Sequence, residues 1–292
     1  MPLQKKKKIS ALIIGMLLCI NSATANSIKI TKDIEFAVVN NQSLKLDLYQ
    51  PTKPKGSPLV VWIHGGGWRK GTKESCYIDW LPEYGYTVAS ISYRYSSVAK
   101  FPAQIHDCKG AVRWLKANAE KYGYNPKKIF VAGSSAGGHL TALMATTSQN
   151  KELEGAVGGN LKFSSVIQGA VVYYGATDFI LRSKTQPSRA NAKGSVVYDL
   201  LGGGAHEKIK AAKLASACYH VSKNDAPLLI FHGNKDKTVL IDQSEAIKLR
   251  YDKIGVLAEF YTIKEAGHGG QIYYNGENAK RLLKFLKKRA AE

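Results

Sequence analysis

The expected fold is decided by the stretch Ile129-Phe130-Val131-Ala132-Gly133-Ser134-Ser135-Ala136-Gly137. Its first four residues are apolar, as in a buried strand, and the last five form a G-x-S-x-G pentapeptide in front of a helix-like segment. This is the context of a nucleophile elbow, in which a serine lies in a strained turn between strand and helix. Glycine at 133 and 137 avoids collisions with the neighbouring backbone. The stretch predicts Ser135 as a nucleophile, whereas the alternative is an ordinary tight turn.

A glycine-rich loop precedes this elbow along the chain. Residues 58–63 have the pattern of a buried strand of parallel type, and His64-Gly65-Gly66-Gly67-Trp68 follows directly. Successive glycines leave backbone N–H groups accessible to a ligand. We therefore predict an oxyanion hole formed by the amides of Gly66, Gly67 and Ala136, the residue after the serine. His64 is interpreted as a structural residue that fixes the loop.

A base and its orienting acid are predicted near the C-terminus. Asp236 follows the buried strand 227–231, and His268 lies in a loop after the strand-like segment 258–263. The imidazole of His268 would accept the proton of Ser135, and Asp236 would hold the other ring nitrogen's proton. The chain order Ser, Asp, His is that of α/β-hydrolases and differs from the chymotrypsin and subtilisin orders.

The remaining pattern predicts one α/β domain with a mostly parallel sheet, because strands alternate with helices. The expected strands are 28–38, 44–49, 59–63, 87–93, 129–132, 167–173, 228–231 and 258–263. The expected helices are 102–122, 136–146, 242–253 and 276–289. Residues 178–225 contain no clear strand and are well placed for a small cap over the active site, the alternative being a solvated connecting loop.

Several motifs together resemble the α/β-hydrolase group that contains bifunctional feruloyl and acetyl-xylan esterases, with wider similarity to hormone-sensitive-lipase-like carboxylesterases. The resemblance extends from about residue 47 to the C-terminus and is carried by residues 64–68, 101–107, 111–115, 132–139, 174–178 and 232–236. It implies an eight-stranded sheet flanked by helices, and hydrolysis of esters of short or aromatic acids on plant cell-wall polysaccharide. No cofactor is implied, and substrate choice is left open by fold-level similarity.

Residues 1–25 have the pattern of a secretory signal peptide. Lys5 to Lys8 form a basic region, residues 9–20 an apolar core, and Ala23-Thr24-Ala25 an A-x-A cleavage site. About a dozen apolar residues are too few to cross a bilayer, which needs about 20. We expect a mature chain of residues 26–292 in the periplasm or outside the cell, with no transmembrane segment after cleavage.

The chain is strongly basic. Its formal net charge is +20, and removal of the four leader lysines leaves +16. This charge favours polyanionic partners, such as acidic glycans or anionic envelope surfaces. Nucleic-acid binding is not expected, because no recognisable module is present. The alternative to a binding role is that the charged residues form a solvated helix face, and this is the interpretation that we favour for the basic C-terminal helix.

Metal and nucleotide sites are not expected. No histidine has the spacing of a metal ligand, and Gly202 to Gly204 do not follow a strand as a phosphate-binding loop would. In an oxidising compartment two of the remaining cysteines can pair and leave a third free, but the sequence does not say which. These cysteines are Cys76, Cys108 and Cys218.

Other functions share the same catalytic module. An arylformamidase-like amidase has a similar glycine loop and elbow, although an export signal argues against a cytosolic metabolic role. A prolyl-oligopeptidase-like peptidase would carry a long N-terminal propeller region, which is missing from this sequence. A noncatalytic binding protein on the same scaffold commonly lacks a triad member, whereas all three are found here. We therefore expect a serine carboxylesterase.

Overall fold

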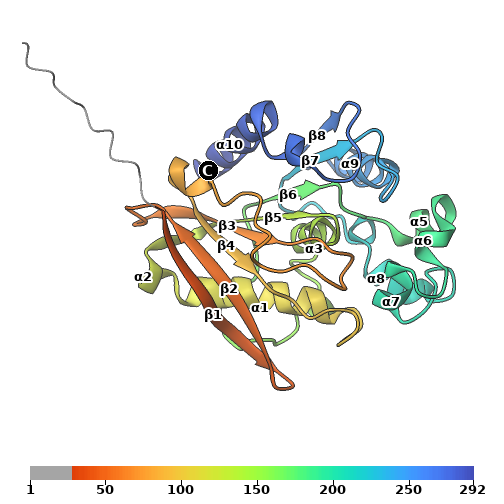
Figure 1. Cartoon of the computed structure of the whole chain (residues 1–292), viewed down its shortest axis with the longest axis horizontal. Coiled ribbons are helices and arrows are strands. Elements are labelled where there is room, and N and C mark those ends of the chain that lie inside the picture. The colour runs from red at the N-terminus through yellow and green to blue at the C-terminus, as the bar shows by residue number, and fades with distance from the viewer. Residues whose placement is uncertain (1–27) are drawn as a thin grey trace, which may run out of the picture.

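The computed structural model describes residues 28–292, and the predicted leader at 1–25 lies outside them. Figure 1 shows a central twisted sheet with helices on both faces. Its eight strands are β1 (Lys29–Val39), β2 (Gln42–Gln50), β3 (Ser57–Ile63), β4 (Thr87–Ile91), β5 (Tyr124–Ser134), β6 (Gly169–Tyr173), β7 (Leu228–Gly233) and β8 (Ala258–Ile263). Their order across the sheet is β1-β2-β4-β3-β5-β6-β7-β8. Strands β3 to β8 run parallel to one another, whereas β2 pairs antiparallel with both β1 and β4. The expected α/β-hydrolase architecture is confirmed.

The helices occupy the connections between these strands. They are α1 (Ala103–Ala117), α2 (Ala119–Tyr122), α3 (Ala136–Thr146), α4 (Lys151–Glu154), α5 (Phe179–Thr185), α6 (Pro187–Ala190), α7 (Val196–Leu201), α8 (Ile209–Leu214), α9 (Asp242–Ile254) and α10 (Gly276–Ala290). Three short 3₁₀ turns, η1 (Leu81–Tyr84), η2 (Ala217–Tyr219) and η3 (Gln271–Tyr273), complete the described elements. Residues 178–225 hold α5 to α8 and η2 and no strand, as the sequence predicted.

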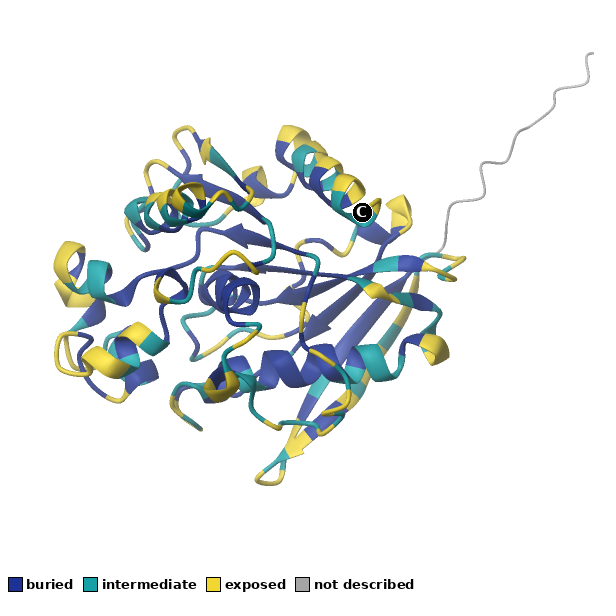
Figure 2. Ribbon diagram, turned by 180° about the vertical axis from the view of Figure 1, so that it is seen from behind, coloured by how far each residue is buried: buried dark blue, intermediate teal, exposed yellow. Residues whose placement is uncertain are grey.

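Alternating side chains of the sheet belong to two apolar layers, one on each face. In β3, Val61 and Ile63 belong to the layer that α1, α3 and α9 cover, whereas Val60 and Trp62 belong to the layer covered by α10 and η1. Such two-sided burial explains why β3 is almost continuously apolar. Figure 2 shows the buried sheet and α3 between helices whose outer faces are exposed. Helix α10 is one of these flanking helices, and its Leu282, Phe285 and Leu286 are buried on one face.

The strand register determines where the functional loops lie. Ile63 of β3 pairs with Gly133 of β5, and Ser134 of β5 pairs with Tyr173 of β6. Tyr173 in turn pairs with Phe231 of β7. Because parallel strands end at the same edge, the loops after β3, β5, β6, β7 and β8 meet there. Residues that are far apart in the sequence are thereby brought to one site.

The cysteines within residues 28–292 form no disulfide. All three described cysteines, Cys76, Cys108 and Cys218, are free and buried. Cys76 belongs to the layer beside α10, whereas Cys108 and Cys218 belong to the opposite layer. The sheet therefore separates Cys76 from the other two, and the pairing that the sequence allowed does not occur.

Candidate active site

The chain enters α3 through a strained turn at Ser135. Its backbone has φ 54° and ψ −115°, a region that residues with a side chain rarely adopt. The turn fits only because its flanking glycines lack side chains. A Cβ on Gly133 would lie 2.6 Å from the carbonyl oxygen of Gly137, and one on Gly137 would lie 2.6 Å from that of His64. The collisions inferred from the sequence are therefore real features of this turn.

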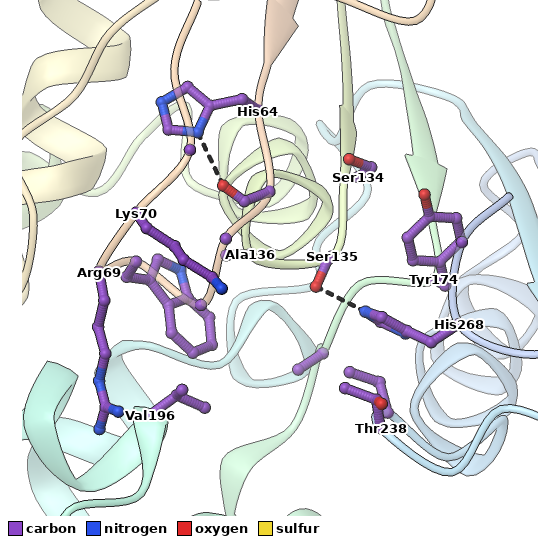
Figure 3. A pocket seen from close by; sticks show the side chains of 18 of the residues that line it. His64, Arg69, Lys70, Ser134, Ser135, Ala136, Tyr174, Val196, Thr238 and His268 are labelled. Atoms are coloured by element: carbon purple, nitrogen blue, oxygen red, sulfur yellow. Dashed lines mark hydrogen bonds between the residues drawn. The ribbon is translucent and has the colours of Figure 1, made fainter. Parts of the chain in front are cut away.

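Ser135 and His268 meet at the edge of the sheet. The Nε2 atom of His268 lies 2.8 Å from Ser135 Oγ, and its Nδ1 atom lies 2.6 Å from Asp236 Oδ2. Figure 3 shows the serine and the imidazole side by side in the cavity wall. The three side chains predicted from chain order are brought into one hydrogen-bonded series.

The environment of Asp236 favours its ionised form. Burial by itself would raise the pKa of this carboxyl, but hydrogen bonds from His232 and His268 outweigh burial and hold the pKa below its usual range. Its Oδ1 atom also accepts the backbone N–H groups of Thr238 and Val239, at 2.8 and 3.0 Å. An ionised Asp236 accepts the Nδ1 proton of His268, so Nε2 presents a lone pair to the serine hydroxyl.

His232 supports Asp236 from behind. This buried imidazole lies at the end of β7, with Nε2 3.3 Å from Asp236 Oδ2 and 2.9 Å from the carbonyl oxygen of Val239. Its Nδ1 atom accepts the Ser244 hydroxyl at 2.7 Å. No role for His232 was predicted from the sequence. Its position at a strand's carboxyl end, four residues before the predicted acid, was the available signal.

The glycine loop after β3 presents its backbone to the same cavity. Gly66 and Gly67 have φ of 108° and 61°, and a Cβ on Gly66 would overlap the carbonyl oxygen of Lys70. Among residues 28–292, the amides of Gly66, Gly67 and Ala136 donate to no protein acceptor. These amides, which the sequence singled out, line the cavity beside Ser135 and are free to bind a negative oxygen.

His64 and His139 hold this loop in place. The His64 ring stacks on Tyr93 at 4.4 Å, and its Nδ1 atom donates to the carbonyl oxygen of Gly65 at 2.7 Å. His139 is fully buried, and burial lowers its pKa to about 4. The neutral ring accepts Trp68 Nε1–H at Nδ1 and donates from Nε2 to the carbonyl of Ala215. Both histidines pack against their neighbours, and for His64 this structural role was expected from the sequence.

The cavity itself has a volume of about 830 Å³. Ser135, His268 and the glycine loop form part of its wall, and residues 178–225 contribute Arg182, Arg189 and Val196. This segment is also joined to the glycine loop, because Arg69 Nη2 lies 2.7 Å from both the Gly194 carbonyl oxygen and Asp199 Oδ2.

Tyr174 is a further wall residue to which the sequence analysis gave no role. It comes directly after β6, and its ring meets the edge of the His268 ring at 4.8 Å. Its hydroxyl bonds to that of Tyr274. Tyr174 therefore packs against the imidazole and limits its movement.

Two buried aspartates lie outside the reacting groups. Asp178 caps α5 by accepting the amides of Ile180 and Leu181, and Asp107 binds the guanidinium of Arg94. Within residues 28–292, no cluster of three or more His, Cys, Asp or Glu side chains is suited to a metal ion. No helix in the same part of the chain has both the length and the apolar character needed to span a bilayer.

Comparisons with known proteins agree with the fold described above. The BD-FAE family model matches residues 46–251. A solved structure described as a truncated carbohydrate esterase from gut microbiota is 27% identical, with a TM-score of 0.83 over 91% of this chain and 98% of that one. A bifunctional GH43-CE protein of Bacteroides eggerthii is 30% identical, with a TM-score of 0.79 over 89% of this chain and 35% of that one.

Curated sequences give a similar result. Esterase LipC of Mycobacterium tuberculosis is 28% identical over 243 residues, which are 81% of this chain and 59% of LipC. The chain spans about half the length of the curated relatives that it matches.

Proposed function

Because the chain belongs to the BD-FAE family of α/β-hydrolases, we propose that it is a carboxylic ester hydrolase that works through an acyl-enzyme on Ser135. One observation carries the proposal. His268 lies 2.8 Å from the serine hydroxyl and 2.6 Å from the buried carboxylate of Asp236. A serine placed in this way can be deprotonated as it attacks.

In the first half of the reaction Ser135 Oγ attacks the ester carbonyl while its proton passes to His268 Nε2. The new imidazolium is stabilised by the ionised Asp236 at Nδ1. The carbonyl oxygen becomes an oxyanion, for which the free amides of Gly66, Gly67 and Ala136 are the proposed donors. One such donor is typically worth about 10²- to 10³-fold in rate.

Collapse of this tetrahedral intermediate breaks the ester C–O bond. His268 returns the proton to the leaving alcohol, and the acyl group stays on Ser135 Oγ. In the second half a water molecule attacks the acyl-enzyme and gives its proton to His268 Nε2. The acid is then released as the proton returns to Ser135. No step needs a metal or an organic cofactor.

The proposed substrates are esters of short or aromatic acids, including acetyl and feruloyl groups on plant cell-wall polysaccharide. Support comes from the solved relative described as a carbohydrate esterase. The aromatic rings of Trp68, Tyr77 and Tyr174 also line the cavity and can pack on a flat or apolar acyl group. 4-Nitrophenyl acetate, methyl ferulate, acetylated xylan and formylkynurenine form a panel that separates these esters from an amide substrate.

The segment 178–225 is proposed to act as the cap. It supplies three side chains to the cavity wall and reaches the glycine loop through Arg69. The leader-like residues 1–25 support export of a mature domain of residues 26–292 to the periplasm or the cell exterior. N-terminal sequencing of the exported protein tests the cleavage site, because a start far from residue 26 contradicts it.

Covalent labelling tests the proposed nucleophile. A fluorophosphonate should label the wild-type protein, and Ser135→Ala should abolish the labelling. The matched control is Ser134→Ala, since Ser134 is the neighbouring buried hydroxyl. Undiminished labelling of Ser135→Ala would mean that another residue is the nucleophile. Absence of both labelling and turnover in the wild-type protein would instead favour a noncatalytic binding protein.

A further inference from the structure

The cavity wall carries positive charge without matching negative charge. Four cationic residues line it, and within residues 28–292 no aspartate or glutamate does. The charge of Arg69 is balanced by Asp199 at 2.7 Å. The other three form no ion pair with any residue that the structure describes. These are Lys70, Arg182 and Arg189.

Arg182 is the most unusual of these side chains, because it is only 2% exposed. Its Nη2 atom donates to the carbonyl oxygen of Thr238 at 2.7 Å, but its buried Nε atom has no acceptor. Burying a cation without an anion is costly. Burial and the nearby charge of Arg189 lower the pKa of Arg182 to about 10, although Asp236 and Asp242 act in the opposite direction. Neither carboxylate is close enough to form an ion pair with it.

Arg189 lies on α6, close to Arg182 on α5. Arg189 is exposed, and its side chain makes no hydrogen bond or ion pair within the described chain, yet it lines the same cavity. Lys70 approaches from the glycine loop, and Figure 3 shows its side chain extending toward the cavity. Two guanidinium groups held near each other repel. An anion between them would relieve the repulsion and supply the missing acceptor.

We infer that Arg182 and Arg189 form a subsite for a carboxylate carried by the ester substrate. This inference rests on the proposed ester hydrolase function and adds a substrate class to it. The carboxylate belongs either to the acyl part, as in a dicarboxylic acid half-ester, or to the alcohol part, as in a uronic-acid-bearing glycan. A carboxylate accepts two parallel N–H groups of a guanidinium, which fits a buried Arg with free donors.

Two matched substrate pairs distinguish these sources. The acyl pair is 4-nitrophenyl hydrogen adipate and 4-nitrophenyl hexanoate, which have the same chain length and differ in the terminal carboxylate. The alcohol pair is acetylated glucuronoxylan and its carboxyl-reduced form, followed by acetate release. The quantity measured is the ratio of kcat/KM for the acidic member to that for the neutral member. A variant effect on the first pair alone assigns the carboxylate to the acyl part, and one on the second pair alone assigns it to the alcohol.

Arg189 is the best position to change, because its exposure and lack of contacts make misfolding of the variant a minor concern. Arg189→Gln should lower the ratio by about fivefold, as loss of a partly exposed charge pair predicts. Arg189→Glu should lower it further, because it repels the carboxylate. The buried variant Arg182→Met should lower it by about tenfold or more. Lys184→Gln removes the same charge from α5 outside the cavity, and it should leave the ratio at the wild-type value.

The inference is overturned if both Arg189 variants keep the ratio within about twofold of wild type for both pairs. In that case the neutral esters are still hydrolysed and the proposed function stands. If wild-type protein hydrolyses no member of either pair, the proposed function itself fails and this inference fails with it. An equal fall in the ratio for Lys184→Gln would also overturn it, because the general surface charge would then be responsible.

Discussion

Replacement of Asp236 by asparagine should inactivate the protein without unfolding it. The Oδ1 atom of Asp236 accepts two backbone amides, from Thr238 and Val239, at 2.8 and 3.0 Å. These donors require a carbonyl oxygen at that position, so the new NH₂ group must occupy the place of Oδ2. There it lies at hydrogen-bond distance from His268 Nδ1 and can only donate to it.

This reversed hydrogen bond selects the wrong tautomer of His268. With Nδ1 accepting, the ring proton moves to Nε2, which lies 2.8 Å from Ser135 Oγ and can then no longer accept the serine proton. Loss of the correct tautomer in a Ser-His-Asp arrangement lowers kcat by about 10⁴, or about 5 kcal/mol of transition-state stabilisation. KM should change little, because Asp236 does not line the cavity.

Steady-state hydrolysis of 4-nitrophenyl acetate by Asp236→Asn measures this loss, and urea unfolding shows whether the variant is folded. Asp178→Asn is the matched control, since asparagine still caps α5 and should keep kcat within a few-fold of wild type. A kcat for Asp236→Asn within about tenfold of wild type would refute the tautomer argument. So would an equal loss of kcat in Asp178→Asn.

Four further outcomes are expected. The carboxylate of Asp236 has a lowered pKa in the folded state. Its contribution to stability is therefore present above its pKa in the unfolded chain, about 3.9, and is lost as the pH falls below that value. Lowering the pH from 6 to 3 should therefore reduce the free energy of unfolding, measured with urea, more for wild type than for Asp236→Asn. Parallel pH dependences of this free energy in the two proteins would contradict the argument. Gly66→Ala should lower kcat by about 10²-fold or more, because its Cβ displaces the loop that presents the amides; wild-type kcat would exclude this loop as an oxyanion hole. Glu154→Ala should lower the free energy of unfolding, measured with urea, by about 3 kcal/mol, because it leaves Lys109 and Arg113 as buried unpaired cations. The control Glu152→Ala, at an exposed neighbouring position, should lower it by less than about 0.5 kcal/mol. Thiol reagents should modify the described cysteines only after unfolding, since burial raises their pKa, and rapid modification of native protein would contradict the described packing. These are Cys76, Cys108 and Cys218.

The reacting groups could be predicted from the sequence because strands and their ends carry strong local signals. Apolar strands such as 228–231 end in short turns, and parallel strands bring those turns to one edge. Ser135, Asp236 and His268 each follow such a strand, so their meeting required no knowledge of packing. The eight strands were all expected, although β5 begins at Tyr124 rather than residue 129. Its first residues include Pro126 and two lysines, which hide the strand pattern.

The positively charged part of the cavity wall could not be predicted from the sequence. Arg182 and Arg189 lie on helices of seven and four residues, which are too short to show a periodic pattern. Their place in the cavity depends on how residues 178–225 fold back on the catalytic loops, which is a tertiary property. A similar limit applies to the expected helix 102–122. It breaks at Asn118 into α1 and α2, and no proline or glycine at the break signals this in the sequence.

Arg69 gives the architecture an evolutionary constraint. Its guanidinium joins the loop of proposed oxyanion donors to Gly194 and Asp199 in the segment 178–225. If residues 178–225 were replaced by the corresponding segment of a homologue, the new segment would have to retain acceptors for this guanidinium. Without them, the glycine loop would lose its contacts with the segment. Diversification of specificity in this lineage is therefore expected to proceed by point changes within residues 178–225 more readily than by wholesale exchange of that segment.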